Sequence, residues 1–262
     1  MHDKTKICAI IQVRMSSSRL PGKALCDIDG LTVIERVINS LKLSKKIDEV
    51  IIATSIDRED DPIETLARNN KISLFRGDLD NVAKRFLDAS EKFGADVIVR
   101  VTGDCPLVSY EIVDLLVDSH FKTEADFTSL ETEKVPVGVC SEIISPKALK
   151  KLVQFNLNLN YSEYMGLYLK NNPDYFSINI VPAPLWFQCP QYRLTLDYAE
   201  DLDMFNQLYI KLKEMNMAIS LTNILLVLEK HPGIAKLNSH LTLKYQTDKQ
   251  LIDRLNKVTR IK

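Results

Sequence analysis

The sequence predicts an α/β protein with a mostly parallel, twisted sheet that is flanked by helices on both faces. Short apolar runs rich in β-branched residues alternate with amphipathic helical patterns through the first half of the 262-residue chain. This alternation is typical of βαβ units, in which the strands lie parallel and the helices cover the sheet. No stretch rich in proline, glycine or serine divides the chain, so we expect a single domain over residues 1–262.

Four strands and four helices are expected to alternate in the first half. Ile7–Val13 predicts a buried strand because it is short, apolar and bounded by polar residues. Thr32–Leu43 predicts a helix, since apolar residues recur in it at helical spacing. The other strands are expected at Glu49–Ala53, Ile72–Phe75 and Asp96–Val101, and the other helices at Pro62–Asn69, Val82–Phe93 and Tyr110–Phe121. Right-handed crossovers should connect the parallel strands.

The pattern changes past residue 122, where strands and helices are mixed and helices then dominate. Strands are expected at Asp126–Leu130, Val135–Ile144, Tyr175–Val181 and Tyr192–Leu196. Helices are expected at Pro146–Val153, Tyr161–Lys170, Ala199–Lys213, Asn223–Glu229 and Lys249–Asn256. The second half therefore adds a lobe to the α/β unit.

Composition narrows the possible functions. The chain has 34 lysines and arginines against 35 aspartates and glutamates, and this balance argues against a general nucleic-acid binder. No apolar run approaches the roughly 18 residues that span a bilayer, and the polar start does not resemble a signal peptide. The five cysteines are widely spaced and form no Cys-x-x-Cys pair, so reduced thiols in a cytoplasmic protein are expected. Neither a dinucleotide-binding glycine fingerprint nor a P-loop occurs.

A polar loop follows the first expected strand, at the sheet edge where ligands of open α/β folds bind. It contains Arg14, Arg19 and Lys23, together with the serine run 16–18. Guanidinium groups pair bidentately with phosphate oxygens, and serine hydroxyls and loop N–H groups add further donors. The loop therefore predicts a polyphosphate site; the alternative is an ordinary solvated loop.

Two aspartates are expected at strand ends. Asp104 follows the fourth strand in a tight turn, where it could bind Mg²⁺ together with substrate phosphates. Asp197 ends a β-rich run just before a helix. The alternatives are a turn or cap residue for Asp104, and for Asp197 a helix start with Glu200 and Asp201 at the positive end of the helix dipole.

Together these stretches resemble the cytidylyltransferases that activate acidic sugars. That group includes the 3-deoxy-manno-octulosonate and acylneuraminate enzymes, and the SpsF-like family of spore coat polysaccharide biosynthesis is the most similar. Three patterns carry the resemblance. They are R-x-x-S-x-R-L-P-G-K at residues 14–23, T-G-D-x-P-L at 102–107 and D-x-x-E-D-L at 197–202, in the family's order.

The resemblance implies a glycosyltransferase-A-like nucleotidyltransferase fold and Mg²⁺-dependent transfer of CMP from CTP to a sugar acid or phosphorylated acceptor. Arg14, Ser17, Arg19 and Lys23 would bind the triphosphate, and Asp104 and Asp197 would hold the metal. The catalytic set is then Arg14, Lys23, Asp104 and Asp197, with Asp104 also contacting CTP. Asn81 would lie near the nucleoside; its alternative role is a helix cap.

The resemblance also divides the single domain by role. Residues 1–125 would form the nucleotide-binding half, about 126–190 the acceptor and dimerisation lobe, and 191–262 the metal-site strand with the C-terminal helices. A homodimer is expected, since these cytidylyltransferases commonly pair and aromatic residues are enriched in interfaces. The aromatic residues of the lobe are Tyr161, Tyr164, Tyr168, Tyr175, Phe176, Trp186 and Phe187. The alternative is that they pack the lobe's own core.

The sequence departs from the family where the acceptor should bind. Cys140 stands at an acidic position of the family, and of a family Arg-Glu-His segment only Glu163 is kept. The sequence therefore does not identify the acceptor, and three other functions are alternatives to CMP transfer. These are a nucleotidyltransferase using another nucleoside triphosphate on a sugar phosphate, a glycosyltransferase consuming a nucleotide sugar, and a non-catalytic nucleotide-binding scaffold subunit.

Overall fold

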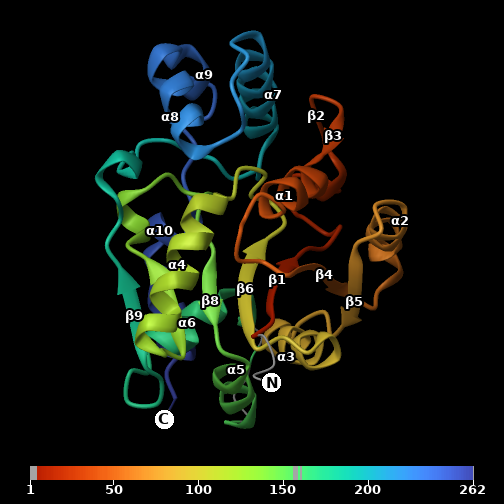
Figure 1. The fold of residues 1–262 in the computed structure, drawn as a ribbon, viewed down its shortest axis with the longest axis vertical. Coiled ribbons are helices and arrows are strands. Elements are labelled where there is room, and N and C mark those ends of the chain that lie inside the picture. Colours follow the sequence, from red (N-terminus) through yellow and green to blue (C-terminus); the bar gives the residue numbers. More distant parts are fainter. Residues whose placement is uncertain (1–4, 156–158, 160, 262) are drawn as a thin grey trace.

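A seven-stranded sheet forms the centre of the computed structural model, which describes residues 5–155, 159 and 161–261 (Figure 1). The strand order is β5-β4-β1-β6-β8-β7-β9, and only β8 runs antiparallel to its neighbours. The strands are β1 (Ile7–Gln12), β4 (Glu49–Ser55), β5 (Ser73–Gly77), β6 (Val97–Thr102), β7 (Phe127–Leu130), β8 (Glu142–Ile144) and β9 (Ile178–Val181). The expected α/β class with a mostly parallel sheet is confirmed.

Helices cover both faces of the sheet, because the central strands are apolar on both sides. In β1, Ala9 and Ile11 pack into one core, while Cys8 and Ile10 pack into the other. The first core is closed by α1 (Val33–Leu41), α2 (Asp61–Asn69), α4 (Tyr110–Thr123), α7 (Ala199–Glu214) and α8 (Leu221–Lys230). The second is closed by α3 (Val82–Phe93), α5 (Pro146–Gln154) and α6 (Met165–Lys170).

The C-terminal quarter of the chain is helical. The helices α7, α8 and α9 (Pro232–Lys236) gather at the top of Figure 1, and the chain then returns along the molecule through α10 (Lys244–Thr247) and α11 (Lys249–Val258). Within the part of the chain that the structure describes, none of the helices has the length and apolar character needed to cross a membrane.

The predictions of two strands in the second half are largely wrong. Of Val135–Ile144, only β8 is a strand, and Tyr192–Leu196 contributes only an isolated bridge between Val137 and Arg193. The reason is that the backbone of Tyr192–Leu196 donates hydrogen bonds to two different parts of the chain. The Leu194 N–H donates to the Val137 carbonyl at 2.8 Å, and the Leu196 N–H donates to the Asp104 carbonyl at 2.8 Å. The segment thus crosses the strand ends instead of joining the sheet.

Smaller differences concern turns. The chain over 161–170 forms a 3₁₀ turn, Ser162–Tyr164, before α6, and β9 begins three residues later than expected. A hairpin of β2 (Asp27–Ile28) and β3 (Leu31–Thr32), with both turn residues at positive φ, was not anticipated, nor were α9 and α10. Within the expected lobe over 126–190, residues 156–158 and 160 lie outside the described part.

Candidate active site

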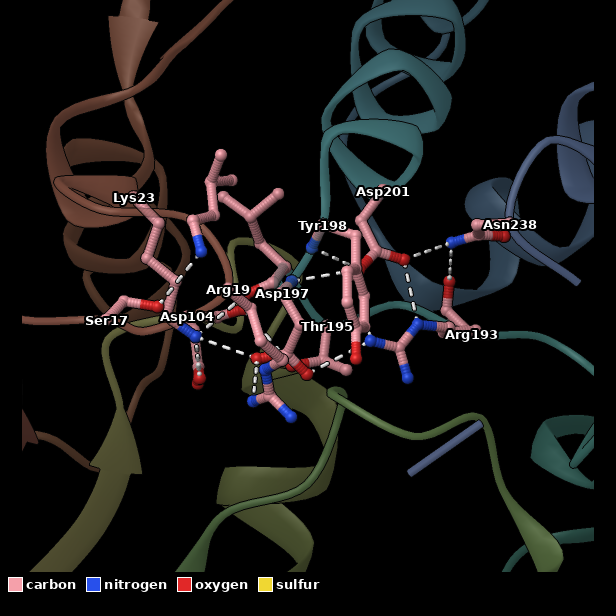
Figure 2. Close-up of polar contacts among 12 residues, drawn as sticks. Ser17, Arg19, Lys23, Asp104, Arg193, Thr195, Asp197, Tyr198, Asp201 and Asn238 are labelled. Carbon is pink, nitrogen blue, oxygen red and sulfur yellow. Dashed lines mark hydrogen bonds and ion pairs between the residues drawn. The ribbon is translucent and has the colours of Figure 1, made fainter. Parts of the chain in front are cut away.

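Three segments that are far apart in the sequence meet at the carboxyl end of β1 and β6 (Figure 2). The Gly103 N–H donates to the Gln12 carbonyl at 2.8 Å, which joins the two loops directly after their strands. A Cβ atom at Gly103 would lie 2.7 Å from the Val13 Cβ, so this close approach requires glycine. The bond from Leu196 to the Asp104 carbonyl adds the third segment. The backbone itself therefore brings the loop over 14–23, Asp104 and Asp197 together.

Lys23 occupies the centre of this group. Its Nζ lies 2.6 Å from the Asp104 Oδ2, 2.9 Å from the Asp197 Oδ1 and 2.8 Å from the Leu196 carbonyl oxygen. Burial opposes a charge on Lys23, but the charges of Asp104 and Asp197 outweigh it and raise the pKa of Lys23. Burial also opposes ionisation of Asp104, and there the charge and hydrogen bond of Lys23 lower the pKa. Lys23 and Asp104 therefore both stay ionised around neutral pH.

Arg19 provides a second cation on Asp197. Its guanidinium NH2 lies 2.5 Å from the Asp197 Oδ1, and it stacks over the Tyr198 ring with 5.5 Å to the centroid. Since Lys23 contacts the same carboxylate oxygen, two cationic side chains converge on one point at the strand ends. The two cationic side chains could bind a polyphosphate, and the carboxylate between them could bind a divalent cation.

Arg14 and Ser17 lie on the outer side of the same loop. The half-exposed Arg14 forms a long ion pair with Glu163, at 3.6 Å. The Ser17 hydroxyl accepts a hydrogen bond from the Leu20 N–H at 3.3 Å and so shapes the loop. An open hollow of about 640 Å³ lies here, lined by residues 14–18 with Pro21, Gly22 and Glu59. Its dimensions and donors suit a phosphate chain.

Asn81 caps a helix. It is the N-cap residue of α3, and its side-chain oxygen accepts from the Lys84 N–H at 2.9 Å. This is the alternative role anticipated for it. Within the described residues, no hydrogen bond joins Asn81 to the Lys23 centre. A nucleoside contact of Asn81 stays a prediction.

A buried network behind Asp197 was missed by the sequence analysis. The Arg193 guanidinium contacts the Asp197 Oδ2 at 3.0 Å and both carboxylate oxygens of Asp201, at 2.8 and 3.0 Å (Figure 2). Asp201 also accepts from the Asp197 N–H at 2.9 Å and from the Asn238 side chain at 2.9 Å. Removing one partner of such a buried ion pair costs about 3–5 kcal/mol, so the network fixes where Asp197 points.

Asp60 is a second residue whose role was missed. Its buried carboxylate accepts from the Met15 N–H at 2.7 Å, and from the side chains of Thr54 and Ser55 at 2.8 and 2.6 Å. Asp60 thereby ties the start of the 14–23 loop to the end of β4. The sequence signal for Asp60 is the acidic run over 57–61, directly before the helix expected at Pro62–Asn69.

The two cysteines nearest the strand ends are poor nucleophiles. Burial raises the pKa of Cys105 to about 12, and burial raises the pKa of Cys140 to about 12 as well. Both thiols therefore stay protonated at neutral pH, and a covalent thiolate mechanism is unsupported at these positions.

Several known proteins are similar to this chain in sequence or in fold. A family model described as cytidylyltransferase matches residues 8–229. The spore coat polysaccharide biosynthesis protein SpsF of Bacillus subtilis is 32% identical, over 87% of this chain and 96% of SpsF. A 3-deoxy-manno-octulosonate cytidylyltransferase of Geobacter sulfurreducens is 26% identical, over 64% of this chain and 62% of that protein. A solved cytidylyltransferase structure from Leptospira borgpetersenii superposes with a TM-score of 0.81 at 30% identity, covering 92% of this chain and 99% of that chain.

Proposed function

Because this chain belongs to the cytidylyltransferase family, we propose that it transfers CMP from CTP to an acidic sugar or a related acceptor, for surface polysaccharide or glycan biosynthesis. Pyrophosphate is the second product. The family match and the resemblance to SpsF support nucleotidyl transfer. The relationship to a 3-deoxy-manno-octulosonate enzyme supports an acidic sugar as acceptor.

The observation that carries the proposal is the convergence of Lys23 and Arg19 on Asp197, with Asp104 on the other side of Lys23. An acceptor oxygen attacks the α-phosphorus of CTP in line, the bond from that phosphorus to the α,β-bridging oxygen breaks, and pyrophosphate leaves. The proton of the acceptor hydroxyl passes to solvent water. Positioning and charge stabilisation supply most of the catalysis in such transfers. Lys23, Arg19 and Arg14 would neutralise the charge that develops on the leaving pyrophosphate.

Asp104 and Asp197 would hold a divalent cation, for which we propose Mg²⁺. Both carboxylates contact the Nζ of Lys23, so their oxygens converge on one position that favours positive charge. Over residues 5–155, 159 and 161–261, no cluster of three or more histidine, cysteine or acidic side chains could hold a metal alone. Two carboxylates completed by substrate phosphates and water suit Mg²⁺. When bound, the ion would supply further neutralisation of phosphate charge.

Pyrophosphate release tests the proposed function directly. We expect release from CTP, above that from UTP, GTP or ATP, with Mg²⁺ and an acceptor from a set of 3-deoxy-manno-octulosonate, N-acetylneuraminate and mannose 1-phosphate. Higher turnover with UTP or GTP on mannose 1-phosphate would instead favour the sugar-phosphate alternative. Consumption of a nucleotide sugar without pyrophosphate release would favour a glycosyltransferase, and CTP binding without turnover on any acceptor would favour a scaffold.

We further propose the division by role into residues 1–125, about 126–190 and 191–262, and a homodimer through the middle lobe. Not all of the lobe's aromatic residues can serve as the interface. Tyr168 is fully buried, and Phe176 and Phe187 are buried too, so these pack the chain's own core. Trp186 and Leu185 are 70% and 81% exposed, in the 3₁₀ turn Leu185–Phe187 that follows the edge strand β9 in the sequence. These two side chains are the better candidates for the interface.

The homodimer is tested by light scattering. We expect a particle of about twice the 29.8 kDa chain mass at micromolar concentration. Trp186→Glu should shift it to the monomer without changing the thermal unfolding temperature, because the side chain packs little in the single chain. Tyr168→Glu, by contrast, should unfold the chain. A monomeric wild-type protein would contradict the proposed dimer.

A further inference from the structure

The segment over residues 238–261 lies beyond the part of the chain that the family model matches, which ends at residue 229. Its first residue, Asn238, is buried and belongs to the network behind Asp197. The Asn238 side chain donates to the Asp201 carboxylate at 2.9 Å and to the Arg193 carbonyl at 3.0 Å. The segment therefore begins at the candidate active site.

The same segment ends against α6. The Asn171 side chain donates to the Thr259 hydroxyl and the Asn172 side chain to the Thr259 carbonyl, both at 2.7 Å. The Ile261 N–H donates back to the Asn172 side chain at 2.8 Å. Because Thr259 is fully buried, this end is as firmly held as the first. The segment is thus a strap that is fixed at both ends across the molecule.

Tyr245 lies between the two fixed ends. Its ring packs edge-on against the Tyr164 ring, with 6.3 Å between the centroids at 63°. Burial raises the pKa of Tyr245, and the charges of Asp104 and Asp197 raise it further, as they also do for Tyr164. The residue before Tyr164, Glu163, accepts at its carbonyl from the Arg100 side chain of β6 at 2.6 Å, so the pair lies near the strand that Asp104 follows. Yet 40% of Tyr245 remains exposed, so the ring has a free surface.

The position of Tyr164 shows which side of the carboxylates this aromatic pair occupies. Tyr164 precedes α6, and a Cβ atom at Gly166 would lie 2.3 Å from a carboxylate oxygen of Glu142 in β8. The pair therefore lies near β8, and the residue before Tyr164, Glu163, also reaches the loop over 14–23, since it forms an ion pair with Arg14 at 3.6 Å. If the loop binds the triphosphate, the aromatic pair borders that site on the side toward β8, which leaves that side for the acceptor.

We propose that Tyr245, carried by the C-terminal strap, binds the acceptor by packing its ring, together with Tyr164, against a polyhydroxylated sugar ring. The C–H face of such a ring stacks on a phenol ring, and its hydroxyls can hydrogen-bond to the phenol oxygen. The Tyr245 hydroxyl donates to no other described residue, so it is available for such a bond. This inference rests on the proposed CMP transfer, and it assigns part of acceptor recognition to a segment outside the family match.

The test separates acceptor binding from nucleotide binding. The protein is saturated with Mg²⁺ and α,β-methylene-CTP, in which the bond to be broken is blocked. The dissociation constants of 3-deoxy-manno-octulosonate, N-acetylneuraminate and mannose 1-phosphate are then measured by saturation-transfer NMR. We expect wild-type protein to bind at least one of them, Tyr245→Ala to bind it about tenfold more weakly, and Tyr245→Phe to stay within about threefold.

Tyr175→Ala is the matched control. Tyr175 is 38% exposed and also packs edge-on against one aromatic ring, that of Phe155, but it precedes β9 at the opposite end of the sheet. The Tyr175→Ala variant should bind the acceptor probes and the CTP analogue with wild-type affinity. The Tyr245 variants should also bind the CTP analogue like wild type. Unchanged acceptor binding by Tyr245→Ala, or no binding of any of the three probes by wild type, would overturn the proposal. Failure to bind the CTP analogue would instead overturn the proposed function.

Discussion

Asp197→Asn is expected to lower kcat for pyrophosphate release from CTP by on the order of 10³-fold. Asparagine keeps the shape of the side chain but removes the charge on which Lys23, Arg19 and Arg193 converge. It also removes one of the two carboxylates that would bind a divalent cation. Asp104→Asn should act in the same direction, because Asp104 is the other carboxylate on Lys23.

Asp203→Asn is the control for this prediction. It makes the same chemical change six residues further on, at an exposed position of α7. Turnover should stay at the wild-type level, and circular dichroism should show all three variants folded. Wild-type turnover of Asp197→Asn, with an unchanged dependence on Mg²⁺ concentration, would remove Asp197 from the candidate metal site.

Lys23→Ala is expected to weaken CTP binding by about 10- to 100-fold in titration calorimetry. A charge-assisted hydrogen bond contributes about 1.5–3 kcal/mol, and the variant loses such a contact to phosphate. It also leaves Asp104 and Asp197 facing each other without the ammonium group that now separates them. The variant should therefore be less stable as well as weaker in binding.

The pH dependence of stability gives a second readout for Lys23. Because the pKa of Asp104 is lowered in the folded chain, its ionisation stabilises the fold above the ordinary value near 3.8. That contribution is lost as the pH falls through the lowered value. Without Lys23 the pKa of Asp104 rises towards its value in the unfolded chain, so acidification below the ordinary value should lower the unfolding temperature less than it does in wild type.

Lys122→Ala serves as the control, since Lys122 is exposed in the last turn of α4 and has no part in the site. It should leave CTP affinity and the acid limb of the stability profile unchanged. Equal CTP affinity of Lys23→Ala and wild type would mean that the 14–23 loop is a solvated surface rather than a triphosphate site.

Local pattern was sufficient for the central strands and the helices of the first half of the fold, although not for the β2–β3 hairpin. The strands β1, β4, β5 and β6 and the helices between them lie where periodicity predicted them, because each buries an apolar face that its own residues define. The loop over 14–23 and Asp104 could be placed together for the same reason, since the carboxyl ends of parallel strands share one edge. The pattern failed at Tyr192–Leu196, where β-rich residues cross the strand ends without forming a strand.

The sequence by itself determined the α/β class, the family and the polar residues at the strand ends, since strand burial and the three patterns are local properties. Only the tertiary structure decided how those residues are held. Arg193, Asp201 and Asn238 fix Asp197, and Asp60 holds the loop at Met15, through contacts between segments that are up to 45 residues apart. The place of Tyr245 beside Tyr164 likewise depends on the anchors of the strap at Asn238 and Thr259. Such contacts depend on where folding brings distant segments together, which no local spacing in the sequence specifies.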